Sequence, residues 1–154
     1  MSSAPMMVPM TIDRAAESGG PIDDVGYRSL ASFRFHVRRF FAFSEATIAA
    51  AGLSSGQYQA MLAIRAYEGG APITVSQLAA SLFVKVNSTV ELVQRLESAG
   101  MVCRTRSEID RRRIELTLTT TGAALLDRLA TEHIAEHRRY LPDLAQIVAG
   151  LGFA

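Results

Sequence analysis

The sequence has 154 residues, enough for one domain or one domain with extensions. Hydrophobic residues make up 49% of it, which is enough for a substantial core, but there is no uninterrupted apolar run of about 18 residues to predict a membrane span. The formal net charge of +1 excludes a uniformly basic protein. The single cysteine excludes an internal disulfide and favours the reducing cytoplasm, and the first residues do not have the pattern of a secretion signal.

Charge is distributed unevenly along this nearly neutral chain. Residues 1–26 contain one basic and four acidic side chains, whereas residues 85–113 contain seven basic and four acidic ones. A local basic region in a protein with little net charge indicates a localised site for a polyanion.

The first part of the chain predicts an arm followed by a long helix. Residues 1–26 contain three prolines and no periodic apolar pattern, which indicates a flexible arm. From Gly26, apolar residues recur every three or four positions, as on one face of an α-helix that Gly52 ends. Five phenylalanines lie within eleven residues of this helix, more than one face can bury. Either a subunit interface or a pocket for an aromatic ligand would explain them.

Two further helices are predicted from their N-terminal capping signals. Ser54 with Gln57, and Thr74 with Gln77, have the spacing of a capping box. The first helix is expected to continue to about Tyr67, and the second to be only about two turns long.

The next helix is predicted to run to Ala99, with Asn87 or Ser88 as its cap and Gly100 ending it. Its buried stripe is expected to be Thr89, Leu92, Val93, Leu96 and Ala99, which leaves Ser88, Glu91, Gln94, Arg95 and Ser98 on the outer face. An α-helix fits the major groove of DNA, and the N-terminal residues of such a helix contact base edges. The expected contact residues are Lys85, Asn87, Ser88, Thr89, Glu91 and Arg95. A solvated amphipathic helix with a Glu91–Arg95 pair is the alternative.

Two strands, Met101–Arg106 and Arg113–Thr119, are predicted to follow as a hairpin, because Ile114, Leu116 and Leu118 alternate with polar residues. The tip between them is rich in arginine, and arginines can enter the narrow minor groove of DNA, where the potential is most negative. The expected DNA contacts here are Arg104, Arg106, Asp110, Arg111, Arg112 and Arg113. Asp110 is expected to pair with either Arg111 or Arg112 and to leave the other one free.

The order of the predicted elements and motifs resembles that of the MarR-type winged-helix transcription regulators. Two helices are followed by LxxxGMV and then by DRRxxxLxLTxxG. The matching positions are Leu96, Gly100, Met101, Val102, Asp110, Arg111, Arg112, Leu116, Leu118, Thr119 and Gly122, with Leu53, Gln57 and Tyr58 upstream. The resemblance implies that Asn87, Ser88 and Thr89 read the major groove and that Arg111 or Arg112 enters the minor groove. Val86 departs from the family, which frequently has a polar residue there. The resemblance also implies that the first and last helices form a homodimer, which would bind a pseudo-palindromic site.

The C-terminal part predicts a long helix from Gly122 to about Tyr140, capped by Thr119, Thr120 or Thr121, and a short final helix that starts at Pro142. His133 and His137 have a metal-ligand spacing, but the HIAEH sequence lacks the glutamate of HExxH. A pair of histidines without metal is therefore expected, either satisfied by other protein groups or exposed. Cys103 is expected to be a buried structural thiol.

These patterns predict a mainly α (α+β) protein with a winged helix-turn-helix and a two-stranded wing. The expected organisation is an arm at 1–26, a dimerisation region at 27–52 and 122–154, and a DNA-binding domain at 53–121. The expected function is that of a cytoplasmic, dimeric repressor of transcription that needs no cofactor, has no catalytic site and is released from double-stranded DNA by a small aromatic or anionic effector. The candidate effector pocket comprises His36, Arg39, Phe40 and Tyr58. A protein-interaction module and a metal-responsive regulator are the alternatives.

Overall fold

The computed structural model describes residues 22–108 and 110–150. Contacts divide the chain into two compact units. Ser44–His133 form the first, called here the winged-helix unit. The second, called the terminal-helix unit, comprises the described parts of Met1–Phe43 and Ile134–Ala154. The predicted arm lies mostly outside the described residues.

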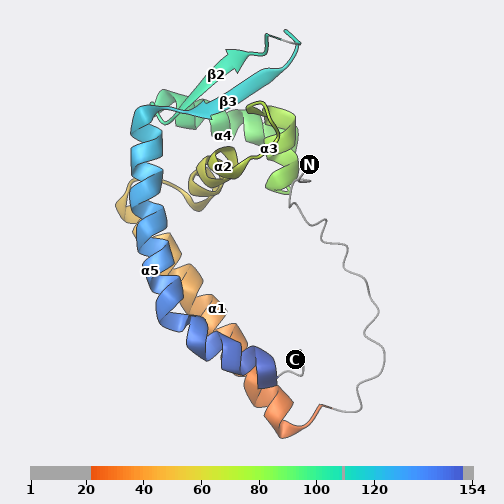
Figure 1. The fold of residues 1–154 in the computed structure, drawn as a ribbon, viewed down its shortest axis with the longest axis vertical. Helices are drawn as coiled ribbons and strands as arrows, with labels where there is room; N and C mark the ends of the chain where they lie inside the picture. The colour runs from red at the N-terminus through yellow and green to blue at the C-terminus, as the bar shows by residue number, and fades with distance from the viewer. Residues whose placement is uncertain (1–21, 109, 151–154) are drawn as a thin grey trace. The chain divides into compact units, whose positions relative to one another are not determined.

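Five helices and three strands occur in the described residues (Figure 1). In chain order they are α1 (Asp24–Ala50), α2 (Ser55–Ala66), β1 (Ile73–Thr74), α3 (Val75–Ser81), α4 (Val86–Ser98), β2 (Val102–Arg106), β3 (Ile114–Leu118) and α5 (Thr120–Gly150). The mainly helical class with a small antiparallel sheet is thus confirmed. Among the described residues, no helix is long and apolar enough to cross a bilayer.

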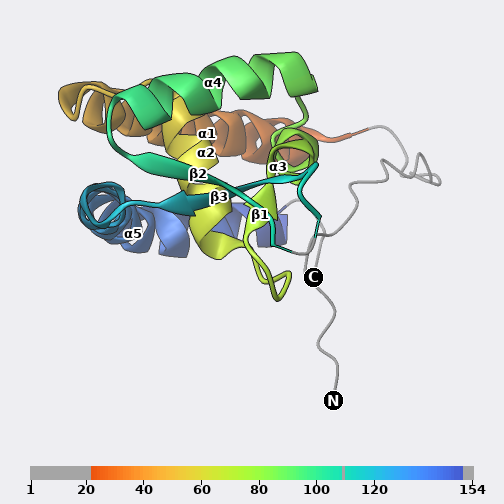
Figure 2. The same ribbon diagram turned by 90° about the horizontal axis from the view of Figure 1, so that it is seen from above.

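The winged-helix unit is built around one hydrophobic core. Met61 of α2, Leu78 of α3, Val93 and Leu96 of α4, and Leu116 of β3 are each at most 1% exposed. The sheet has the order β1-β3-β2, and both pairings are antiparallel. Figure 2 shows the three strands side by side, with α4 running along β2. The predicted wing has two strands, so the short β1, which pairs through Ile73 with Leu116, is an addition to that prediction.

Local signals place the helix ends in this unit. Both predicted capping boxes are present, with Ser54 bound to Gln57 and Thr74 bound to Gln77 in both directions. Gly52 and Gly100 have φ angles of 76° and 70°, which glycine adopts at the ends of helices without a steric penalty. At the start of α5, Thr119 Oγ1 accepts a hydrogen bond from the N–H of Gly122 at 3.0 Å, so Thr119 is the cap among the three candidate threonines.

Other predicted boundaries and orientations differ from the structure. Helix α1 begins at Asp24 rather than at Gly26. No second helix starts at Pro142, because α5 continues through this proline to Gly150. A proline removes one hydrogen bond from a helix but does not always end it. Ala99 is exposed and does not belong to the buried stripe of α4.

In the terminal-helix unit, aromatic side chains of α1 and α5 pack against each other. The Phe40 ring stacks on His137 at 4.3 Å between ring centroids. One turn away, the guanidinium of Arg39 lies 4.6 Å above the ring of Tyr140, and His36 lies 6.1 Å from the same ring. Phe35 and Phe41, in contrast, are 53% and 55% exposed. One face of α1 therefore packs against α5, while large apolar groups remain on another.

Candidate nucleic-acid interface

The outer face of α4 is polar and exposed, as the sequence predicts. Asn87, Ser88, Glu91, Gln94 and Arg95 are all exposed. The expected Glu91–Arg95 pair is present, with 3.5 Å between Glu91 Oε2 and Arg95 Nη2, and both side chains are more than two-thirds exposed. The face therefore presents donors, acceptors and charges that remain accessible to a partner.

Thr89 does not belong to this face. It is 0% exposed, and its hydroxyl donates a hydrogen bond to the carbonyl oxygen of Lys85 at 3.2 Å. It therefore lies in the buried stripe of α4, as one expectation had it, and its side chain is not accessible for the DNA contact that was also expected.

The cap of α4 also differs from the prediction. Lys85 is the N-cap residue, and no side chain makes a capping hydrogen bond there, so neither Asn87 nor Ser88 caps the helix. Both residues lie within the first helical turn and their side chains stay exposed. The uncapped first turn leaves backbone N–H groups available to an anion, which the helix dipole favours at this end.

The hairpin tip is ordered by Asp110 and Ser107. The backbone N–H of Ser107 donates to the carbonyl of Arg113 at 3.0 Å, and the N–H of Arg113 donates to the carbonyl of Asp110 at 2.8 Å. One carboxylate oxygen of Asp110 accepts the backbone N–H of Arg112, and the other lies 3.3 Å from Arg113 Nε. The expected pairing of Asp110 with the side chain of Arg111 or Arg112 is therefore wrong, because its ionic partner is Arg113.

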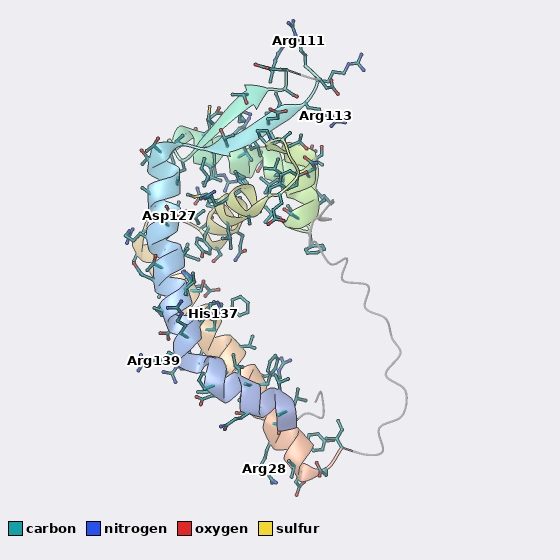
Figure 3. The ribbon with its side chains drawn as sticks, in the orientation of Figure 1. Arg28, Arg111, Arg113, Asp127, His137 and Arg139 are labelled. Carbon is teal, nitrogen blue, oxygen red and sulfur yellow. The ribbon has the colours of Figure 1, made fainter. Side chains whose placement is uncertain are left out.

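Of the remaining arginines of the hairpin, one forms an ion pair and the others do not. Arg104 is held by Glu97 of α4, at 2.7 Å between Nε and Oε2. Arg106, Arg111 and Arg112 are exposed and have no ion pair within the described part of the chain. Figure 3 shows Arg111 at the far end of the hairpin, with its side chain directed away from the helices. The charges available to a polyanion are thus concentrated at the tip.

A groove of about 610 Å³ lies between the hairpin and the helices of the same unit. Its walls include Val86 and Val90 of α4, and its charged lining residues are Arg104, Arg112 and Arg113, with no carboxylate among them. The groove joins the first turn of α4 to the base of the hairpin tip. It thus connects the two predicted contact regions, and Arg112 is its arginine without an ion pair among the described residues, since Arg104 and Arg113 are paired with Glu97 and Asp110.

Cys103 differs from its predicted environment, whereas His133 adopts one of the two that were expected. Cys103 is exposed, because β2 turns Val102 toward the core and the next residue outward, opposite Thr117. His133 is 6% exposed and satisfied by protein groups, which is the first of the two expected alternatives. Its Nε2 lies 2.8 Å from the hydroxyl of Ser44, its Nδ1 lies 2.7 Å from the carbonyl of Leu129, and its ring stacks on Tyr58.

Because both ring nitrogens of His133 are engaged, the His133–His137 spacing does not present two free metal ligands. Within residues 22–108 and 110–150, no group of three or more His, Cys, Asp or Glu side chains has a metal-binding arrangement.

The candidate effector residues fall in different units. Tyr58 is 4% exposed in the core of the winged-helix unit, and burial raises the pKa of its phenol, so the hydroxyl stays neutral. His36, Arg39 and Phe40 lie on α1 in the terminal-helix unit. His36 Nδ1 is buried and has no hydrogen-bond partner among the described residues.

Some residues that organise the interface carry no signal in the sequence. Ser107, only 4% exposed, ties the two ends of the tip together, and Glu97 fixes Arg104 from the neighbouring helix. The spacing of Glu97 and Arg104 matches no periodic rule, since they lie on different elements. Only the packing of β2 beside α4 brings them together.

Comparisons with known proteins agree with this geometry. Residues 51–113 match the model of the MarR family. The chain is 31% identical over 96 residues to the transcriptional regulator PecS of Dickeya dadantii, covering 61% of this chain and 57% of PecS. The matched segment thus spans about half the length of the curated relatives, 57% for PecS and 47% for an organic hydroperoxide resistance regulator of Bacillus subtilis.

Solved structures show the same fold. AbsC of Streptomyces coelicolor, a MarR family transcriptional regulator, superposes with a TM-score of 0.65 at 24% identity, covering 82% of this chain and 84% of AbsC. A mutant of MepR from S. aureus, solved bound to an oligodeoxyribonucleotide, superposes with a TM-score of 0.64 at 18% identity, covering 82% of this chain and 93% of MepR.

Proposed function

We propose that this chain, whose residues 51–113 match the MarR family model, is a winged-helix regulator of that family. In this proposal it is a cytoplasmic, sequence-specific double-stranded DNA-binding repressor of transcription that acts as a homodimer and is released by a small ligand. The observation that carries the DNA-binding part is the pair Arg111 and Arg112, which are exposed and unpaired at the tip of a hairpin beside an exposed polar helix face. Asp110 supports this arrangement because it engages Arg113 and leaves the other two arginines to a partner.

The proposed docking places α4 in the major groove and the hairpin tip in the adjacent minor groove. The phosphate backbone between two adjacent grooves would then face the surface between helix and hairpin, which is lined by Arg104, Arg112 and Arg113. On α4, Asn87, Ser88 and Glu91 are accessible for base edges; a carboxylate such as Glu91 accepts from the amino group of cytosine. The polar character of this face argues for DNA over a protein partner, whose binding surface would be more apolar at its centre.

A homodimer is supported by the exposed apolar surface of the terminal-helix unit. Large apolar side chains that are 37–61% exposed there are Ile22, Val25, Tyr27, Leu30, Phe35, Phe41, Ile134 and Val148. Monomeric proteins rarely leave so many large apolar groups on one pair of helices. Two-fold pairing through these helices would present two α4 helices to a pseudo-palindromic site.

Release by a small effector is supported by the surroundings of His36. Its buried Nδ1 has no partner among the described residues, and Arg39 lies nearby on the same helix with its charge above Tyr140. The carboxylate of an aromatic acid could accept hydrogen bonds from the Arg39 guanidinium, and its ring could pack against the rings of His36 and Tyr140. Tyr58 is left out of this proposal because its ring is already stacked on His133.

DNA binding is tested by fluorescence anisotropy with labelled DNA from the region upstream of the protein's own gene and with a scrambled sequence of the same composition. The proposal predicts tighter binding to the upstream DNA and a steep fall in affinity with salt, because counterions are released from neutralised phosphates. Equal, feeble binding to both DNAs would disprove the proposed function.

The effector proposal is tested by thermal unfolding with salicylate at millimolar concentration. Binding to the folded state predicts a higher Tm for the wild type. His36→Ala with Arg39→Ala should abolish the increase, whereas Arg34→Ala, an exposed arginine on the same helix, should keep it. An unchanged Tm in the wild type would count against a site for aromatic acids.

A further inference from the structure

The turn between α3 and α4 contains a residue that combines a strained backbone conformation with an exposed apolar side chain. Phe83 has a φ of 55°, in the left-handed region. The N–H of Phe83 donates to the carbonyl of Ala80, and the N–H of Val84 donates to that of Ala79, which ends α3 in a Schellman motif. Glycine usually occupies the position of Phe83, since a side chain there is strained.

Burial does not compensate for this strain. The Phe83 side chain is 82% exposed. Val84 and Val86 are 46% and 47% exposed, and these three exposed apolar residues, which lie within four positions of the chain, are called here the apolar turn. Core packing does not explain the three side chains, and the backbone conformation disfavours a side chain at Phe83, which together point to a contact with a partner.

The surroundings of the apolar turn indicate which partner it meets. Lys85 lies between Val84 and Val86 and is the N-cap residue of α4, where no side chain makes a capping hydrogen bond. Val86 lines the same groove as Arg112, an exposed arginine that has no ion pair among the described residues. A partner that carries negative charge beside small apolar groups fits this combination. The major groove of DNA has both, because phosphates flank it and each thymine presents a C5-methyl group.

We propose that Phe83 and Val86 contact thymine C5-methyl groups in the major groove, so that the apolar turn selects thymine at defined positions of the binding site. This inference rests on the proposed DNA-binding function. It adds an apolar contribution to specificity, beside the hydrogen bonds available to Asn87, Ser88 and Glu91. An apolar surface for a protein partner is the competing explanation, and the following test separates the two.

The experiment compares two versions of the DNA that the protein binds selectively, one with thymine and one with deoxyuridine at every thymine position. Deoxyuridine lacks only the C5-methyl group and keeps the base-pairing atoms. We expect the wild type to bind the deoxyuridine DNA at least about fourfold more weakly, which corresponds to the loss of one buried methyl group. In Val86→Ala and in Phe83→Gly, this ratio should be smaller than in the wild type, because each variant loses the partner of one methyl group and keeps the other.

Leu62→Ala is the matched control, since Leu62 is an apolar residue of the same unit that is 37% exposed and lies on α2. It should keep the fourfold ratio. Phe83→Gly also has an independent readout, because glycine relieves the left-handed strain, so its Tm should not fall below that of the wild type. A lower binding affinity with an undiminished Tm would assign the phenylalanine to binding rather than to folding.

Each outcome bears on a separate claim. Selective binding by the wild type with equal affinity for thymine and deoxyuridine DNA would overturn the inference and leave the proposed function intact; the apolar turn would then be assigned to a protein partner. A ratio that persists in both variants would also overturn it, because another residue would be reading the methyl groups. Equal, feeble binding to unrelated DNA would overturn both claims.

Discussion

At the scale of single residues, the hydrogen bond between Ser44 and His133 is the most deeply buried polar contact between side chains that the structure describes. Both residues are 6% exposed. Because the carbonyl of Leu129 can only accept, His133 Nδ1 carries the proton, and in the neutral imidazole Nε2 accepts from the Ser44 hydroxyl. This contact joins α1 to α5 within the winged-helix unit.

Replacing the Ser44 hydroxyl should lower the stability of the protein. Ser44→Ala removes the donor to a buried nitrogen, and we expect the free energy of unfolding to fall by about 1–3 kcal/mol. Urea unfolding followed by circular dichroism measures this. Ser98→Ala, at an exposed position on α4, is the control and should change stability by less than about 0.5 kcal/mol. Equal urea midpoints for the two variants would show that the hydrogen bond contributes nothing.

Residue types at the interface could be predicted from the sequence, but their partners could not. The spacing of exposed and buried positions on α4 identifies Asn87, Ser88 and Glu91 correctly as accessible, because helical periodicity is a local property. The choice of Arg113 as the partner of Asp110 depends on the conformation of the hairpin tip. The orientation of Cys103 depends on which residue starts the strand alternation, which the pairing of β2 with β3 sets.

At the scale of elements, the junction between β3 and α5 depends on a close approach of two backbone segments. Thr119 Oγ1 donates to the carbonyl of Gly100 at 2.6 Å and accepts from the N–H of Gly122. A Cβ atom on Gly122 would collide with the carbonyl group of Met101. The glycine is therefore required by space, since backbone atoms cannot move aside as a flexible side chain can.

Two glycine substitutions should have opposite effects. Gly122→Ala should lower the free energy of unfolding by about 1–3 kcal/mol through overpacking. Gly56→Ala, within α2, should raise it by about 0.5–1 kcal/mol, because the nearest atom to the new methyl group is Leu92 Cδ1 at 3.8 Å and alanine favours the helix. Thermal and urea unfolding of both variants measure the difference. Similar stabilities would refute the steric argument.

The sequence predicted elements best where the signal is local. The capping boxes at Ser54 and Thr74 involve residues three positions apart, and both are present. The start of α4 was misplaced because the left-handed turn at Phe83 lets the helix begin directly after Lys85. Strand β1 is two residues long, too short to show alternation, and it exists only through its pairing with β3.

At the scale of the whole molecule, the proposed dimer is tested by a charge in the exposed apolar surface of α1. Leu30 is 42% exposed in the terminal-helix unit, and Leu30→Asp should shift the protein from dimer to monomer, because a carboxylate would have to be desolvated at an apolar interface. Sedimentation velocity gives the mass. Leu62→Asp, on the winged-helix unit, should remain dimeric. A wild type that sediments as a monomer at micromolar concentration would contradict the homodimer.

The fold class was predictable because helix caps, apolar periodicity and the strand alternation from Ile114 to Leu118 agree with one another. The surface proposed to form the homodimer is harder to predict from the sequence. An excess of phenylalanine in α1 indicates a surplus of apolar surface, but not what covers Phe35 and Phe41. That assignment depends on a second molecule, about which one chain contains no direct information.

The central claim is that the unpaired arginines of the hairpin tip bind DNA. It is tested most directly by the salt dependence of binding to the upstream DNA, compared for two variants that lose the same charge. Arg111→Ala/Arg112→Ala removes the tip charges, and Arg138→Ala/Arg139→Ala removes two exposed arginines of α5 in the terminal-helix unit.

The account predicts that the tip variant loses affinity and that its slope of log affinity against log salt falls in magnitude by about 2, since each lost phosphate contact contributes about 0.9. The α5 variant should keep the wild-type slope. If the two variants behave alike, or if the tip variant binds as the wild type does, the hairpin tip is not a DNA contact and the account is wrong.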